Sequence, residues 1–459
     1  MGISITSQGG DRGICVVVPA GGPSYELAQV AVFTDLRCSV RFAKVHARRK
    51  ATAMPARFNV ELAIVKLAVF LAPMAALRFS AIFITMSDVI FALALLVRLA
   101  KGKIPLYPFH DATRYWYAGL VLVGFGIMIS SIFHGAAMDG SIMTSQYFFS
   151  YLCLPLVIMG RRYDEAVALV KVGAWSIAVI CAIGIFAYVY DIRSFGHINK
   201  LVTGSGRVAS LLDNPNTFAS LIALYFPIMM FLVSKKEMNV IIITSLISLL
   251  LISLILSGSN SGAISCFIGI MAFILLFGSL RQVIVSIFAA TAFVYATIRW
   301  GKLFLPSVFQ DRVLSAVLEG DASEAGTFDF RMALIREAIG KLDNNLIIGM
   351  GADQYRPNSD LGLHVHNTYL LLTNEGGLIA LIGLIVILAT AARIGFSCIG
   401  VRGGRAEAAA ILAAVVAIGS VMMSITHVYA RFIIVPLLLL LGVAVARDRA
   451  EESTPARIE

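Results

Sequence analysis

Residues 364–383, HVHNTYLLLTNEGGLIALIG, decide how the fold is interpreted, because a polar segment gives way to a hydrophobic one within them. They close the longest polar interruption of the chain, which runs from about residue 300 to residue 377. Two polar motifs stand out, HVHN at 364–367 and NEGG at 374–377. Their meaning depends on which other polar residues share their side of a membrane, so the topology has to be derived first.

The composition is that of a membrane protein. Of 459 residues, 59% are hydrophobic and only 14% are charged, whereas a soluble domain carries roughly 25% charged residues. Hydrophobic runs of ~20 residues recur from residue 60 onward, each long enough to cross a bilayer core of ~30 Å. The net charge of +10 fits Lys and Arg gathered in cytoplasmic loops better than nucleic-acid binding. These features predict a polytopic helical membrane protein.

Hydropathy predicts about twelve spans between two cytoplasmic tails. Residues 1–56 resemble neither a signal peptide nor a span and are expected to be a disordered tail, and Met54 is an alternative start. The membrane domain covers 57–446, and 447–459 form the C-terminal tail. The expected spans are 60–78, 83–100, 116–134, 146–160, 167–190, 217–233, 239–257, 261–279, 282–299, 377–394, 406–424 and 430–446.

Positive charge alternates between the short loops, as the positive-inside rule requires. Lys and Arg follow the even-numbered spans, for example Arg161 and Arg162 after the fourth and Lys235 after the sixth. The odd-numbered connections are poorer in cations. This pattern places both termini inside and several polar features outside: 204–216, 257–262, the large loop 300–376, and His427 with Arg431.

The large exterior loop contains an expected amphipathic helix. Its apolar residues Met332, Ile335, Ile339 and Leu342 recur on one face, and Arg336, Glu337 and Lys341 occupy the other. Glu337 precedes Lys341 by four residues, which favours an ion pair. Residues 343–345 end the helix, and the glycines of 347–355 predict a turn rather than a phosphate loop.

Taken singly, the polar residues have ordinary explanations. An isolated exterior His366 would most often bond to a neighbouring backbone group, and Arg207 would be an interfacial anchor. The acidic residues Glu319, Asp321 and Glu324 are expected to lie in a solvated loop, and no spacing matches a dedicated metal cage.

Several motifs taken in order resemble the O-antigen ligase and polymerase superfamily of bacterial membrane glycosyltransferases. They are GRVASLLDNPNTFASLI (206–222), SGSNSGAISCFIG (257–269), RMALIREAIGKLDNNLIIGMGADQY (331–355) and HVHNTYLLLTNEGGLIALIG (364–383). The first resembles the family's arginine-containing stretch, and the last two resemble its large periplasmic loop and exit. One departure is Asn260, which stands where many members carry arginine.

The resemblance implies a GT-C-like helical bundle in the bacterial inner membrane with its active site facing the periplasm. It implies transfer of a glycan from an undecaprenyl-diphosphate carrier to an acceptor glycan or glycolipid, with no cofactor, no metal and no nucleic acid. Arginine suits the diphosphate because it binds such oxygens bidentately, so Arg207 and Arg331 are the expected ligands. His366 is the expected general base. The expected supporting residues are Asn260, His364, Asn367, Glu375, His427 and Arg431.

Two labels within the enzyme class remain open. A ligase would hand a finished chain to lipid A–core in lipopolysaccharide biosynthesis, whereas a polymerase would join carrier-linked repeat units into O-antigen or exopolysaccharide. The ligase label is slightly favoured. A transporter, such as a lipid-linked oligosaccharide flippase, is the rival from another class, but the halves of the chain are unequal and show no repeat.

Overall fold

The computed structural model describes residues 14–17, 29–32, 41–43, 59–79, 84–195, 200–304, 306, 309–310, 328–401 and 403–452. The chain divides into two units, residues 1–59 and 60–459. In the first, β1 (Ile14–Val17), β2 (Gln29–Val32) and β3 (Arg41–Ala43) form an antiparallel sheet in the order β1-β2-β3, with Ala31 opposite both Cys15 and Phe42. Apart from these strands, the expected disordered tail lies outside the described residues, as do Glu319, Asp321 and Glu324.

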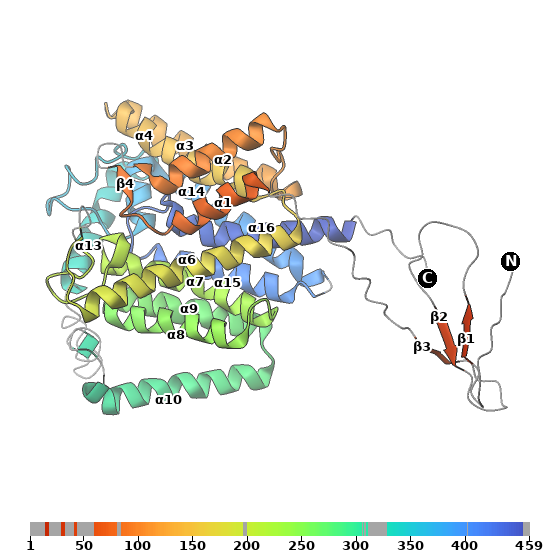
Figure 1. The fold of residues 1–459 in the computed structure, drawn as a ribbon. Helices are drawn as coiled ribbons and strands as arrows, with labels where there is room; N and C mark the ends of the chain where they lie inside the picture. Colours follow the sequence, from red (N-terminus) through yellow and green to blue (C-terminus); the bar gives the residue numbers. More distant parts are fainter. Residues whose placement is uncertain are drawn as a thin grey trace. The chain divides into compact units, whose positions relative to one another are not determined.

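The second unit is a helical bundle (Figure 1). A small hairpin, β4 (Arg78–Phe79) and β5 (Ile84–Thr85), separates its first two helices. A π-helical turn, Phe149–Cys153, joins α4 to α5. The helices are α1 (Val60–Leu71), α2 (Met86–Ala100), α3 (Thr113–Phe133), α4 (Ala137–Phe148), α5 (Leu154–Ile158), α6 (Tyr163–Val189), α7 (Pro215–Ser234), α8 (Val240–Ser257), α9 (Asn260–Phe277), α10 (Leu280–Phe304), α13 (Phe328–Asn345), α14 (Thr368–Ser397), α15 (Arg405–Val421) and α16 (Arg431–Glu452), with single 3-10 turns at His110–Ala112, Ser210–Leu212 and Cys398–Gly400.

Helices lie at all twelve positions where spans were expected. Within the described residues, eight stretches are long and apolar enough to cross a membrane: His110–Phe133, Ala137–Ile158, Tyr163–Val189, Pro215–Ser234, Val240–Ser257, Asn260–Phe277, Leu280–Gly301 and Thr368–Gly400. Three of the others, α1, α2 and α15, have 12, 15 and 17 residues, and α16 carries Arg431, Arg447 and Asp448. An all-α, multi-pass membrane bundle is therefore confirmed, while the count of twelve and the exterior side of the large loop stay predictions.

The central packing contact joins α3 to α14 through glycines. A Cβ atom added at Gly119 would lie 2.7 Å from the Gly383 carbonyl oxygen, and one at Gly126 would lie 2.7 Å from that of Gly376. The two backbones therefore touch along the helix pair, as small residues permit in membrane bundles. This contact fixes the N-terminal half of α14, where the polar NEGG motif lies.

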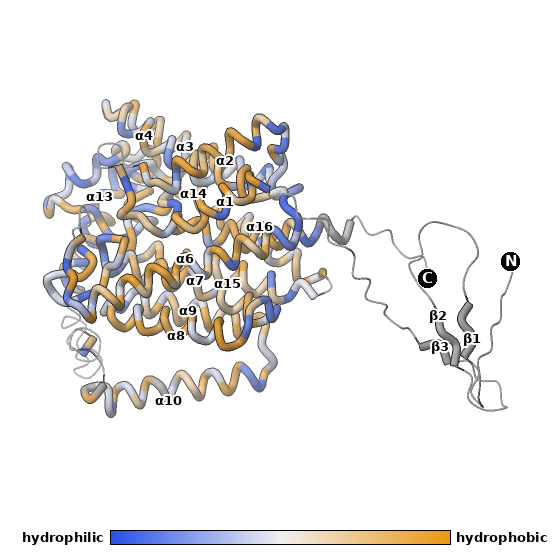
Figure 2. The backbone as a smooth tube through the Cα atoms, viewed as in Figure 1, coloured by the Kyte–Doolittle hydropathy of each residue, from blue (hydrophilic) through white to orange (hydrophobic). Residues whose placement is uncertain are grey.

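Ion pairs hold the end of the bundle that was expected to be cytoplasmic. The buried Glu61 carboxylate lies 3.4 Å from Arg98 and 3.2 Å from Arg161. Glu407, also buried, pairs with Lys235 at 2.8 Å and Arg447 at 2.5 Å. Figure 2 shows hydrophilic residues at both ends of the bundle and mostly apolar helices between them. The other end carries the candidate site.

Candidate functional site

The site is built on an interruption in α14. The helix begins at Thr368, earlier than the expected span at 377, and breaks at Gly377, where φ is +71°. The backbone groups near the break are satisfied from outside the helix, because an unpaired buried backbone group is costly. Met350 N donates to the Asn374 oxygen (2.6 Å), Gly351 N to the Glu375 oxygen (3.0 Å), and Leu378 N to the Leu346 oxygen (2.7 Å).

This docking explains the glycines of the GMG turn. A Cβ atom at Gly349 would overlap the backbone of Glu375, so only glycine lets the two backbones approach. The sequence predicted a turn here, and the structure adds that the turn is clamped onto α14. The end of α3 completes the clamp: Ser130 Oγ donates to the Glu375 carbonyl oxygen (2.6 Å), and Ser131 Oγ accepts from Ala352 N (2.9 Å).

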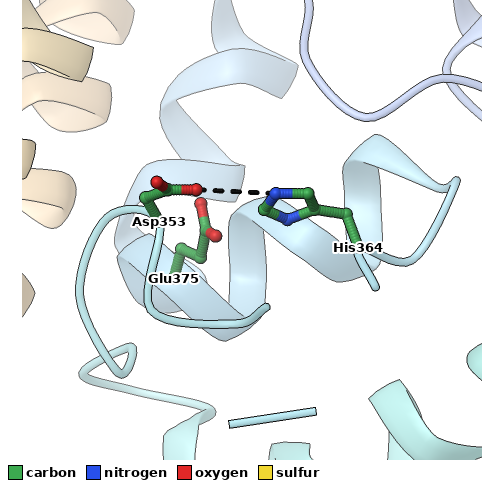
Figure 3. A group of neighbouring side chains, drawn as sticks. All are labelled: Asp353, His364 and Glu375. Atoms are coloured by element: carbon green, nitrogen blue, oxygen red, sulfur yellow. Dashed lines mark ion pairs between the residues drawn. The ribbon is translucent and has the colours of Figure 1, made fainter. Parts of the chain in front are cut away.

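The clamp brings Asp353, His364 and Glu375 together (Figure 3). One nitrogen or oxygen atom from each lies within 4.8 Å of the others, and His364 Nε2 is 3.5 Å from Asp353 Oδ1. Glu375 is only 1% exposed, whereas Asp353 is exposed at the surface. His364 and Glu375 were expected as supporting residues. Asp353 was missed, and its one signal is that it is the only acidic residue of the glycine turn.

The HVHN motif is anchored by its two residues other than histidine. Val365 is fully buried in a small apolar cluster with Leu334, Ala338, Met350, Tyr355 and Leu371. Asn367 caps α14, because its side chain accepts from Leu370 N at 3.1 Å. Asn367 therefore has a structural role as the N-cap of α14. His364 and His366 flank Val365 on either side.

Helix α13 places Arg331 near His366. The helix spans Phe328–Asn345, and Glu337 pairs with Lys341 at 3.5 Å as expected. Its buried face was predicted wrongly, since Leu334 and Ala338 are buried while Ile339 is 53% exposed. The expectation missed this because the face packs against Val365 and its neighbours, which are distant in sequence.

Arg331 precedes Leu334 and Ala338 by three and seven residues, so it lies on the same face of α13. Partial burial, followed by the charge of Arg331 and then that of His364, lowers the pKa of His366. Because the ring is exposed and its pKa is lowered, His366 is a neutral imidazole at pH 7 that can accept a proton.

Arg207 lies at the same end of the bundle but contacts a different set of residues. It is buried, its Nε donates to the Ser257 carbonyl oxygen (2.7 Å), and its Nη2 donates to Asn216 Oδ1 (2.6 Å). These bonds hold the loop before α7 against the end of α8. Asn260 begins α9 directly beyond, after the capping residue Ser259.

Two further contacts tie this region to the histidines. Ser265 and Ser420 hydroxyls lie 2.9 Å apart and join the first turns of α9 to the end of α15. Thr368 N, at the start of α14, donates to the Met422 oxygen at 2.8 Å. Arg207, Asn260 and the HVHN motif thus share one end of the bundle.

The last pair of expected residues, His427 and Arg431, lines a polar cavity. The His427 ring lies 6.0 Å from that of His364 and stacks on Tyr429 at 5.0 Å. Burial, with His364 nearby, lowers the pKa of His427 to about 3. Arg431 Nε lies 2.5 Å from the buried Asp88 carboxylate.

Two cavities meet at Arg431. The first, of about 450 Å³, is lined by polar and charged residues that include Arg78, Asp139, Asp353 and His427, together with apolar residues such as Met143 and Phe432. The second, of about 810 Å³, is an apolar groove between α2 and α4. Ile142, Gln146 and Arg431 line both. An apolar groove that opens at an arginine beside a polar cavity has the character of a site for a lipid with a polar headgroup.

Residues 245–385 match the family model described as O-antigen ligase. The matched segment runs from α8 into α14 and contains Asp353, His364, His366 and Glu375. A comparison with curated proteins gave no match. The match confirms the resemblance that the sequence motifs indicated, and it brings the general activity of membrane glycosyltransferases acting on lipid-linked glycans. The family assignment therefore rests on residues 245–385, which are similar to the O-antigen ligase family.

Proposed function

We propose that this protein transfers a glycan from an undecaprenyl-diphosphate carrier to an acceptor hydroxyl at the periplasmic face of the inner membrane. The observation that carries the proposal is the pair of cavities that meet at Arg431, at the end of the bundle where the family-matched histidines lie. A polyprenyl chain needs an apolar groove, and a carbohydrate headgroup needs hydrogen-bonding side chains. The two cavities offer these surfaces side by side.

Arginines at this end suit the diphosphate. Arg331 is near enough to His366 to alter its pKa, and Arg207 is held rigidly by Ser257 and Asn216. A guanidinium fixed in place before the reaction stabilises charge that develops on a leaving diphosphate without reorganising. Arg331 and Arg207 therefore hold the donor in this proposal, and Arg431 lies where its chain enters the cavity.

His366 is the proposed general base. As the acceptor oxygen forms a bond to the anomeric carbon, the hydroxyl proton passes to the imidazole. The bond between the anomeric carbon and the diphosphate oxygen breaks, and its electron pair leaves with the diphosphate. A single displacement of this kind inverts the anomeric configuration, and none of its steps requires a metal. The low pKa of His366 favours the neutral, proton-accepting form before the reaction.

The test is transfer by purified protein in detergent, supplied with carrier-linked glycan and acceptor and with no membrane gradient. His366→Ala and Arg331→Ala should each abolish product while the protein still inserts and is expressed, and Arg207→Ala should do the same. His134→Ala is the matched control, because His134 is an exposed histidine at the same end whose ring bonds to the Ser130 carbonyl oxygen. Normal product from the His366 and Arg207 variants would remove this mechanism. Product formed without a gradient would exclude the transporter alternative.

The glycan that accumulates in a deletion strain distinguishes a ligase from a polymerase. Long carrier-linked chains left unattached would identify a ligase. Single carrier-linked repeat units would identify a polymerase. The donor chemistry proposed here is the same in both cases, so either result leaves the roles of Arg331 and His366 intact.

A further inference from the structure

We propose that Asp353, His364 and Glu375 form a binding site for a divalent cation of the zinc and manganese type. The site goes beyond the glycan transfer described above, in which no chemical step is assigned to these three residues, although Asp353 also lines the cavity of about 450 Å³. It lies where the glycine turn, the HVHN segment and the break in α14 meet (Figure 3). One carboxylate comes from the turn, one from the helix, and the imidazole from the segment between them.

The buried carboxylate of Glu375 points to a ligand. Its Oε1 atom has no hydrogen-bond partner among the described residues, although the side chain is 1% exposed. The backbone amides of Asp353 and Tyr355 are placed to donate to the carboxylate, and the carboxylate of Asp353 lies beside it. Figure 3 shows the Glu375 carboxylate directed toward the space between Asp353 and His364. A buried carboxylate beside a second acidic group is costly unless it takes up a proton or a positive charge is supplied.

The contacts within the trio do not supply that charge. His364 lies 3.5 Å from Asp353, which is long for a hydrogen bond between charged partners. A metal ion binds an imidazole through a ring nitrogen in its neutral form. The other ring nitrogen, Nδ1, is buried without a hydrogen-bond partner in the described part of the chain.

The donor set selects the type of cation. One imidazole and two carboxylates suit zinc or manganese, whereas calcium and magnesium favour sites built from oxygen alone. Ligand atoms bound at ~2.0–2.2 Å from one zinc ion lie at most ~4.4 Å apart. The present atoms lie within 4.8 Å of one another, so a small movement of the exposed Asp353 side chain closes the site.

Such a cation would hold three segments in one place. His364 is two residues from His366, so binding at His364 fixes the HVHN segment on the side opposite the buried Val365. Asp353 and Glu375 would at the same time lock the turn to α14, adding to the backbone bonds of Met350 and Gly351. The cation is a positioning element for the loop that carries His366.

The experiment is calorimetric titration of the full chain, purified without a histidine tag and stripped with chelator, with Zn²⁺, Mn²⁺ and Mg²⁺ separately. One Zn²⁺ or Mn²⁺ per chain is expected, with much weaker Mg²⁺ binding. Asp353→Asn changes an exposed loop residue and Glu375→Gln conserves shape, so both variants should fold. Each should weaken binding roughly tenfold or more, the range seen when the surroundings of a metal are altered.

Asp139→Asn is the control, because Asp139 is a half-buried acid that lines the same cavity as Asp353 but lies outside the trio. Its affinity for Zn²⁺ should equal that of the unaltered protein. Failure of the unaltered protein to bind either ion, or equal binding by the Asp353 and Glu375 variants, would overturn the inference. Because the readout is binding rather than transfer, either result leaves the proposed glycan transfer untouched.

Discussion

Replacing Gly377 by alanine should release the glycine turn from α14. Gly377 has φ +71° and ψ 179°, a conformation that only glycine adopts readily. An added Cβ atom would also overlap the carbonyl group of Ile347 in the docked turn. Gly377→Ala therefore strains the break in the helix and pushes against the segment that the break holds.

The extent of undocking depends on the backbone strain that alanine introduces, compared with the stabilisation from the hydrogen bonds that hold the turn. The backbone strain at this φ and ψ costs roughly 1–3 kcal/mol. The docked turn is held by bonds from Met350, Gly351 and Leu378, which at about 1 kcal/mol each contribute about 3 kcal/mol. The strain alone is thus comparable with the bonds that hold the turn, and the overlap with Ile347 adds to it. The variant should populate an undocked turn.

Hydrogen exchange measured by mass spectrometry tests this directly. The amides of Met350, Gly351 and Leu378 exchange when the turn opens, and a loss of roughly 1–3 kcal/mol raises their exchange rate about 5- to 150-fold. Gly362→Ala separates the causes, because Gly362 has φ +63° but open space around its Cβ position. Gly340→Ala carries neither cost and is the baseline. Exchange in Gly377→Ala no faster than in Gly340→Ala would refute the reasoning.

Three further substitutions, two near the site and one at the other end of the bundle, are tested by thermal unfolding. Arg431→Ala leaves the Asp88 carboxylate buried without its partner and should destabilise the protein by about 3–5 kcal/mol, whereas a second change, Asp88→Asn, should restore much of that loss. Asn367→Ala removes the cap of α14 and should cost about 0.5–2 kcal/mol, while Asn367→Asp should keep it. Glu61→Gln at the other end should lower stability by up to about 3 kcal/mol. The loss is limited because the Val157 and Met159 carbonyl oxygens still accept hydrogen bonds from Arg98. Glycan transfer per folded molecule should be unchanged.

The positions of the helices were predictable from sequence because a segment can cross a bilayer when most of its residues are apolar, and this property can be read from composition alone. The start of α14 was not. The polar residues 373–376 argued for a loop, yet the helix runs through them from Thr368. Asn374 is buried there because its side chain donates to the Ala338 and Leu370 carbonyl oxygens. Partners of this kind belong to the tertiary structure, and no local pattern announces them.

The residues of the candidate site likewise fall into those that the sequence could predict and those that depend on tertiary packing. Arg331 and His366 could be paired from sequence only through the family resemblance, and their electrostatic coupling depends on how α13 packs on Val365. Arg207 was expected to bind a diphosphate, and the sequence gave no sign of the bonds to Ser257 and Asn216 that hold its side chain in the structure. Asp353 could not be predicted, because its place beside Glu375 arises from a turn docked onto a distant helix break.

In this chain, the residues that make a motif recognisable are therefore not the same as the residues proposed to react. Much of what makes HVHN and NEGG recognisable is structural: Asn367 caps a helix, Val365 fills a core, and Gly377 permits a break. The break allows the glycine turn to bind the helix, which brings Glu375 beside Asp353 and His364. A helix that continued without interruption would satisfy its own carbonyl groups and leave the glycine turn with nothing to bind. The glycines thus act on the chemistry indirectly, by creating the surface on which the reactive side chains are held.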